Sequence, residues 1–162
     1  MKGEILIVLM LIISHSAISQ CELKTTTRYD GSLLNYFNPK PVIRQSNYEI
    51  GVSVYKNVTT DVTMLNVSVL FLGKKPNSLN GNAIIQTSGE RGISLEPIIF
   101  DLVEMNGRDV AVGLYKIEGS MLEYFKKTYL KSIVVRVGTD LVGATVNENE
   151  WVIRDNIKCL EK

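Results

Sequence analysis

Two stretches near the middle of this chain alternate apolar and polar side chains at every second residue. The stretches are residues 48–55 and 64–72, and the polar residues 57–61 lie between them. Their apolar faces are formed by Tyr48, Ile50, Val52 and Val54 in the first stretch and by Leu65, Val67, Val69 and Phe71 in the second. A period of two is typical of β-strands that bury one face. Because the connection is too short for a helical crossover, we expect the two strands to pair antiparallel.

A tight hairpin is predicted at Asn106-Gly107, because this pair tolerates the positive φ angles of a two-residue turn. The flanking residues 98–105 and 110–115 should then pair as strands. Apolar residues occupy both of their faces, which indicates strands covered on both sides or a register that the pattern leaves open. Other strands are expected at residues 83–87, 133–137 and 141–146.

Helix signals come late in the chain. Ser120 and Glu123 have the spacing of a capping box, which would start a helix. The residues that would follow it are apolar at helical spacing (Leu122, Phe125 and Tyr129) or basic in the later turns (Lys126, Lys127 and Lys131). Cations favour the end of a helix dipole, so this basic cluster needs no ligand.

The end of the chain predicts a second helix over residues 147–160. Ile153, Ile157 and Leu160 recur at i, i+4 and i+7, and Asn147 with Glu150 resembles a helix cap. The alternative is a last strand through residues 151–153. At the other end, residues 20–47 look irregular or edge-like, and the prolines within residues 38–41 should break any regular element.

These signals together predict a mainly β fold. We expect an antiparallel β-sandwich or partly open barrel, with one or two α-helices near the C-terminus.

An export signal is predicted over residues 1–19. A lysine is followed by the apolar run 5–13 and by the small-residue exit Ala17-Ile18-Ser19, with cleavage before Gln20. A retained membrane anchor, a core helix and lipidation at Cys21 are the alternatives; the apolar run is about half of what a spanning helix needs. Residues 20–162 then form one β-rich domain, secreted or periplasmic, without a transmembrane segment.

Cleavage would remove His15, which is the one histidine of the chain. A chain without imidazole has no Ser-His-Asp triad, Cys-His pair or histidine-ligated zinc. We therefore assign no catalytic, cofactor-binding or metal-ligating residue, and no cofactor. Three carboxylates that cluster around the predicted hairpin remain as acid–base candidates: Asp101, Glu104 and Asp109. They support the alternative of a histidine-free hydrolase acting on carbohydrate.

The two cysteines, Cys21 and Cys159, bracket the predicted domain. An oxidising destination favours a disulfide between them. Such a bond would close nearly the whole domain and contribute about 5 kcal/mol in the chain-entropy description. The alternative is a buried Cys159 and a free thiol at Cys21.

The formal net charge of +1 argues against a nucleic-acid partner, which would require a large basic surface. Several aromatic residues either pack in the domain or present a binding face: Tyr29, Tyr36, Phe37, Tyr48, Tyr55 and Trp151. We expect a non-enzymatic binding or envelope-associated protein whose partner is a protein or a glycan.

The chain resembles small secreted β-rich proteins of Bacteroidetes. The resemblance rests on the exit Ala17-Ile18-Ser19-Gln20, the segments 36–39 and 48–53, and the ending at 157–160. The resemblance implies a periplasmic or secreted β-rich domain. It carries over neither an activity nor functional residues.

Overall fold

The computed structural model describes residues 21–89 and 91–162, so the predicted signal peptide lies outside the described residues. Within them the chain forms strands and two helices in this order: β1 (Lys24–Thr27), β2 (Leu33–Tyr36), β3 (Lys40–Arg44), β4 (Tyr48–Asn57), β5 (Val62–Phe71), β6 (Leu79–Thr87), β7 (Gly92–Leu95), β8 (Pro97–Met105), β9 (Arg108–Ile117), α1 (Gly119–Phe125), β10 (Leu130–Val137), β11 (Asp140–Thr145) and α2 (Val152–Leu160).

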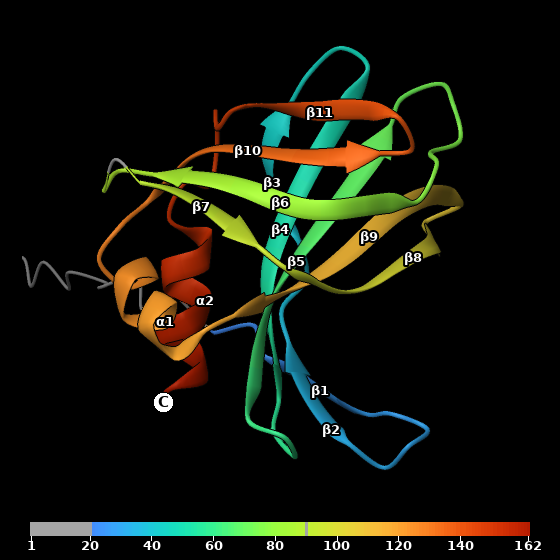
Figure 1. The fold of residues 1–162 in the computed structure, drawn as a ribbon. Coiled ribbons are helices and arrows are strands. Elements are labelled where there is room, and N and C mark those ends of the chain that lie inside the picture. The colour runs from blue at the N-terminus through green and yellow to red at the C-terminus, as the bar shows by residue number, and fades with distance from the viewer. Residues whose placement is uncertain (1–20, 90) are drawn as a thin grey trace, which may run out of the picture.

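The strands make two antiparallel sheets. The large sheet has the order β1-β2-β4-β5-β9-β8, and the small sheet has the order β11-β10-β6-β7. Strand β3 pairs with the first half of β4, and β2 pairs with its last residues. The strands of the small sheet run across β4 and β5 of the large one (Figure 1). The predicted mainly β class, with antiparallel pairing and helices near the C-terminus, is confirmed. The predicted pairing of the two alternating stretches is also present, with Val52 opposite Val67.

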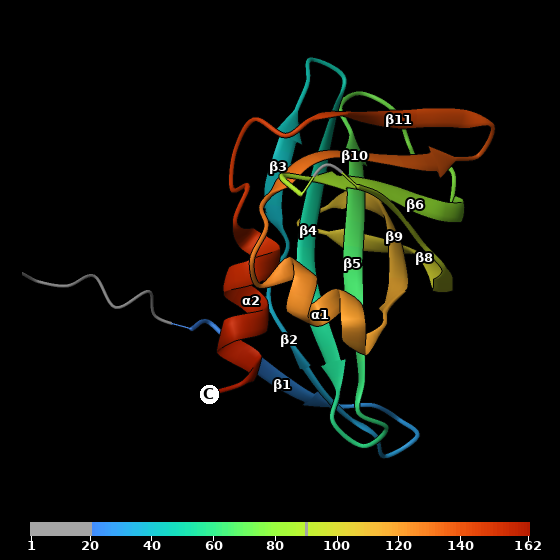
Figure 2. The same cartoon turned by 60° about the vertical axis from the view of Figure 1, so that its left-hand side comes forward.

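The core lies between the two sheets and consists of the faces that the period-two pattern marks as apolar. Ile50, Val52 and Leu65 are fully buried there, and the small sheet contributes Ile85 and Ile133. Both helices lie at one end of the sheets (Figures 1 and 2) and add side chains to the same cluster: Phe125, Val152, Ile153 and Ile157. Each such side chain contributes about 1.5–3 kcal/mol by leaving water.

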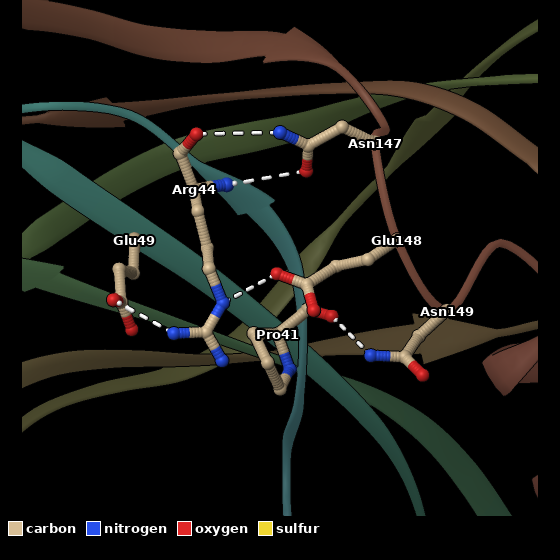
Figure 3. Close-up of polar contacts among 6 residues, drawn as sticks. All are labelled: Pro41, Arg44, Glu49, Asn147, Glu148 and Asn149. Atoms are coloured by element: carbon tan, nitrogen blue, oxygen red, sulfur yellow. Dashed lines mark hydrogen bonds and ion pairs between the residues drawn. The ribbon is translucent and has the colours of Figure 1, made fainter.

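Residues 147–149, which follow β11 and which we call the strap, lie beside β3 and contact it through their side chains (Figure 3). The side-chain amide of Asn147 bonds both backbone groups of Arg44, its oxygen accepting from N and its nitrogen donating to O, each at 3.3 Å. Asn149 donates to the carbonyl oxygen of Pro41 at 2.7 Å. The Arg44 guanidinium lies between the carboxylates of Glu49 and Glu148. These contacts satisfy backbone groups at the outer edge of β3. Of the two predicted architectures, the sandwich and the partly open barrel, the arrangement of the sheets is closer to the second.

On the opposite side, one residue, Glu96, separates β7 in the small sheet from β8 in the large one. The chain therefore turns a corner from sheet to sheet there, and on that side the backbone itself joins the two sheets.

The predicted cysteine pair is present as a disulfide. The Cα atoms of Cys21 and Cys159 are 5.8 Å apart, and the bond spans 138 residues of sequence. It ties the start of the described chain to the end of α2, and the two segments lie side by side in Figure 2.

Both predicted helix caps are wrong. Helix α1 begins after Glu118 without a side-chain cap, so Ser120 lies inside its first turn, and Lys131 belongs to β10 rather than to the helix. Helix α2 begins at Val152, because the Asn147 side chain bonds β3 instead. The alternative of a last strand at residues 151–153 is also wrong.

Other boundaries differ because pairing partners override local signals. The region expected to be irregular or edge-like contains β1, β2 and β3, of which β1 is an edge strand of the large sheet. Pro41 does not break β3, because a register shift in the β3–β4 pair accommodates it. Strand β6 starts at Leu79 rather than residue 83, because Leu79 pairs with Val137. Strand β8 is neither covered on both faces nor internal; it is an edge strand with exposed Ile98, Ile99, Leu102 and Met105.

Candidate binding site

The face of the large sheet that points away from the small sheet contains a hollow of about 370 Å³, which we call the outer hollow. Strand alternation places its residues opposite the core residues of the same strands. The lining is Arg28, Leu34, Tyr36, Asn38, Pro39, Tyr55, Met64, Asn66, Ser68, Ile99, Asp101, Val103, Met105, Val112 and Leu114.

The register of the sheet assembles these residues from strands that are distant in sequence. Ser53 of β4, Asn66 of β5 and Leu114 of β9 form one cross-strand row, which continues to Ile99 of β8. Side chains opposite each other in an antiparallel pair lie about 4.5–5.5 Å apart at Cβ, so a row behaves as one contact surface.

Two tyrosines form one wall of the outer hollow. Tyr36 and Tyr55 lie opposite each other on β2 and β4, with ring centroids 5.5 Å apart and planes tilted by 53°. Burial raises the pKa of the Tyr55 hydroxyl above its ordinary value, and the neighbouring Tyr36 adds to the shift. This wall is therefore aromatic and uncharged at neutral pH.

Asn66 lies at the floor of the outer hollow and is 1% exposed. Its Nδ2 donates to Ser53 Oγ at 3.1 Å, and its Oδ1 is buried without a hydrogen-bond partner. Turning the amide over would satisfy Oδ1 and leave Nδ2 unpaired instead. In either orientation one end of the amide lacks a partner, at a cost of about 1–3 kcal/mol.

The rim of the outer hollow carries two opposite charges. Arg28 comes from the turn after β1, and Asp101 comes from β8; both are exposed. The Asp101 carboxylate accepts a hydrogen bond of 2.8 Å from the backbone N–H of Leu102. That contact occupies a backbone donor of the edge strand, which limits pairing of β8 with another strand.

The three carboxylates that support the hydrolase alternative are divided between the two faces of the sheet. Asp101 lines the outer hollow, whereas Glu104 and Asp109 lie opposite each other on the other face of the β8–β9 hairpin. Asp109 also forms an ion pair with Lys75 at 3.4 Å. Among the described residues that line the outer hollow, Asp101 is the one carboxylate.

A second hollow, of about 480 Å³, lies beside the disulfide and the strap. Its lining is more polar and includes Lys40, Glu150 and Asp155. The Asn156 oxygen there accepts from the Val54 backbone N–H at 3.0 Å, which fixes α2 against β4. No group of three or more histidine, cysteine, aspartate or glutamate residues suited to a metal ion occurs in residues 21–89 and 91–162.

The aromatic residues that the sequence marks as a possible binding face have different roles. Tyr36 and Tyr55 line the outer hollow, whereas Tyr48 packs against Phe71 and Trp151 against Tyr129. Sequence reasoning missed Asn66, because a polar residue on the outward side of an alternating strand is ordinary. A usable signal was its position in the middle of a ten-residue strand.

Comparison with protein-family models, with curated proteins and with solved structures finds no match to this chain. The resemblance to secreted proteins of Bacteroidetes therefore stays a prediction. Within the described part of the chain, no helix has the length and apolar character needed to cross a membrane.

Proposed function

We propose that this protein is a non-enzymatic, exported binding domain that receives an apolar small molecule in the outer hollow. The observation that carries the proposal is the hollow itself, a space of about 370 Å³ bounded largely by apolar side chains of five strands. Sites for small molecules occupy about 300–1,000 Å³ and combine an apolar lining with a few polar groups. The outer hollow has this size and this chemistry.

Binding rather than hydrolysis is favoured by the placement of the carboxylates. Glycoside hydrolysis needs two carboxyl groups that flank the bond to be broken. Asp101 faces the outer hollow while Glu104 and Asp109 face away from it, so this hollow does not bring the predicted pair together.

Export is supported by the disulfide between Cys21 and Cys159, because such bonds persist in oxidising compartments. Together with the predicted signal peptide, it favours a periplasmic or secreted location. A protein or glycan partner stays a prediction beside the small-molecule site.

The test is a titration of the exported, disulfide-bonded protein with N-phenyl-1-naphthylamine, an uncharged dye that fluoresces in apolar surroundings. Ile98 and Ile99 offer a matched pair of variants, because both are 48% exposed on β8 and only Ile99 lines the outer hollow. We expect one saturable site, weakened about tenfold or more by Ile99→Lys and unchanged by Ile98→Lys. Absence of saturable binding, or equal effects of the two variants, would overturn the proposal.

A further inference from the structure

We propose that Asn66 is the specificity-determining contact of the outer hollow and selects a ligand with a flat apolar body and one hydroxyl group. This inference rests on the proposed function, since it names the chemical class of ligand that the same site takes. The observation behind it is a buried amide that lies at the floor of an apolar hollow with one end unpaired.

The fold accounts for only one of the two polar ends of the amide at this position. Asn66 lies between Ser53 of β4 and the apolar Leu114 of β9, and its neighbours two residues away on the same face of β5 are Met64 and Ser68. An apolar residue would remove the unpaired end of the amide but would leave the fully buried Ser53 hydroxyl without its partner, so the fold accounts for one end of Asn66 and not for the other.

Ser53 supplies a hydrogen-bond partner for only one end of the Asn66 amide. Its hydroxyl lies in the same cross-strand row, is fully buried and takes one end of the amide at 3.1 Å. An amide has two polar ends, and the second has no protein partner. A ligand in the hollow can supply that partner.

A hydroxyl is the group that fits this position. The unpaired end of Asn66 is a carbonyl oxygen in one orientation of the amide and an NH2 group in the other. A hydroxyl both donates and accepts, so it satisfies either end. Because Asn66 is almost fully buried, a ligand reaches its free polar end only when a neighbouring side chain shifts. Met64, two residues away on the same face of β5, is a flexible side chain suited to such a shift.

The body of the ligand is defined by the walls. Tyr36 and Tyr55 present ring surfaces on one side, and Val112 and Leu114 present aliphatic surfaces on the other. Arg28 and Asp101 carry opposite charges at the rim, so the site has no net preference for an ion. These features together fit an uncharged, flat, aromatic or alicyclic alcohol.

The probes for the test are 2-naphthol and naphthalene, which differ by one hydroxyl group. Water solvates the hydroxyl, so a purely apolar hollow would favour naphthalene. We expect the wild-type protein to bind 2-naphthol about tenfold or more tightly than naphthalene. Asn66→Leu should abolish or reverse that preference and leave the affinity for naphthalene unchanged. Asn82→Leu, at an exposed asparagine of β6, is the control and should keep it.

A measurement on the wild-type protein keeps the test valid if Asn66→Leu fails to fold. The side-chain NH2 signals of Asn66, observed by nuclear magnetic resonance, should shift saturably with 2-naphthol and far less with naphthalene. Equal affinity for the two probes, or no shift at Asn66, would overturn this inference and leave the proposed function standing. Failure of the folded protein to bind either probe would count against both.

Discussion

The sealed interior and the outer hollow each contain a buried polar atom without a partner, on neighbouring residues of paired strands. Tyr115 of β9 points into the interior, where its hydroxyl has no hydrogen-bond partner, and Asn66 of β5 points to the outer hollow. Burial raises the pKa of the Tyr115 hydroxyl, whose ring lies over Gly113 and against Phe100. The Tyr115 hydroxyl is enclosed by the core, whereas Asn66 adjoins a space that a ligand can enter. The same local defect is therefore a cost to stability in one region and an available contact in the other.

The largest expected effect is a loss of stability of the whole domain on removal of the disulfide, which does not distinguish the interior from the outer hollow. Replacing Cys21 and Cys159 together by serine should lower the free energy of unfolding by about 3–5 kcal/mol, because the bond restricts the unfolded chain over 138 residues. Urea unfolding measures the loss. The affinity of the outer hollow for the dye should not change while the variant is folded. A loss below about 1 kcal/mol would contradict the prediction.

A pair of alanine substitutions compares packing on the two sides of β5. Leu65 faces the interior and is fully buried, and Met64 lines the outer hollow and is 7% exposed. Leu65→Ala should cost about 2–5 kcal/mol, because the core cannot collapse around the cavity. Met64→Ala should cost less than half as much, since the space it leaves joins an existing hollow. Equal losses in denaturant unfolding would mean that the hollow is packed like the core.

Removing the two unpaired polar groups one at a time should show which affects stability alone and which affects ligand selectivity. Tyr115→Phe deletes an unpaired hydroxyl and should raise the free energy of unfolding by about 1 kcal/mol, without changing probe binding. Asn66→Leu should abolish the preference for 2-naphthol without a comparable gain in stability, because it leaves the buried Ser53 hydroxyl without its partner. Thermal unfolding and probe titration on both variants check this. Destabilisation by Tyr115→Phe would show that the hydroxyl has a partner in solution.

The smallest expected effect is a loss of stability at alkaline pH. The ordinary pKa of a tyrosine hydroxyl is 10.0, and the folded protein raises it at both Tyr55 and Tyr115. Above pH 10 the unfolded chain therefore releases these protons before the folded chain does, so stability falls as pH rises. Tyr115→Phe should remove more of this decline than Tyr55→Phe, because Tyr55 is partly exposed. The opposite order in unfolding experiments between pH 9 and 11 would contradict the comparison.

The features that the sequence predicted well are those that depend on a few neighbouring residues. The alternation at residues 48–55 and 64–72 became β4 and β5, and Asn106-Gly107 became a hairpin turn with φ angles of 53° and 73°. The predicted helix cap at Asn147 is wrong because a distant partner, which no local pattern indicates, takes its side chain. Asn147 has a local capping signal, but both ends of its amide bond the backbone of Arg44, about a hundred residues earlier.

The sequence by itself determined a β-rich fold, the pairing of its central strands and the one possible disulfide, because hydrophobic period, turn chemistry and cysteine number are local or countable properties. The sequence also indicated the buried faces of β4 and β5, but the tertiary structure alone decided which strands border the open face and where that face is hollowed. It also decided that Ser53, Asn66 and Leu114 form one row, because register and sheet curvature arise from contacts between distant strands. The outer hollow and its unpaired amide exist only once those strands are side by side.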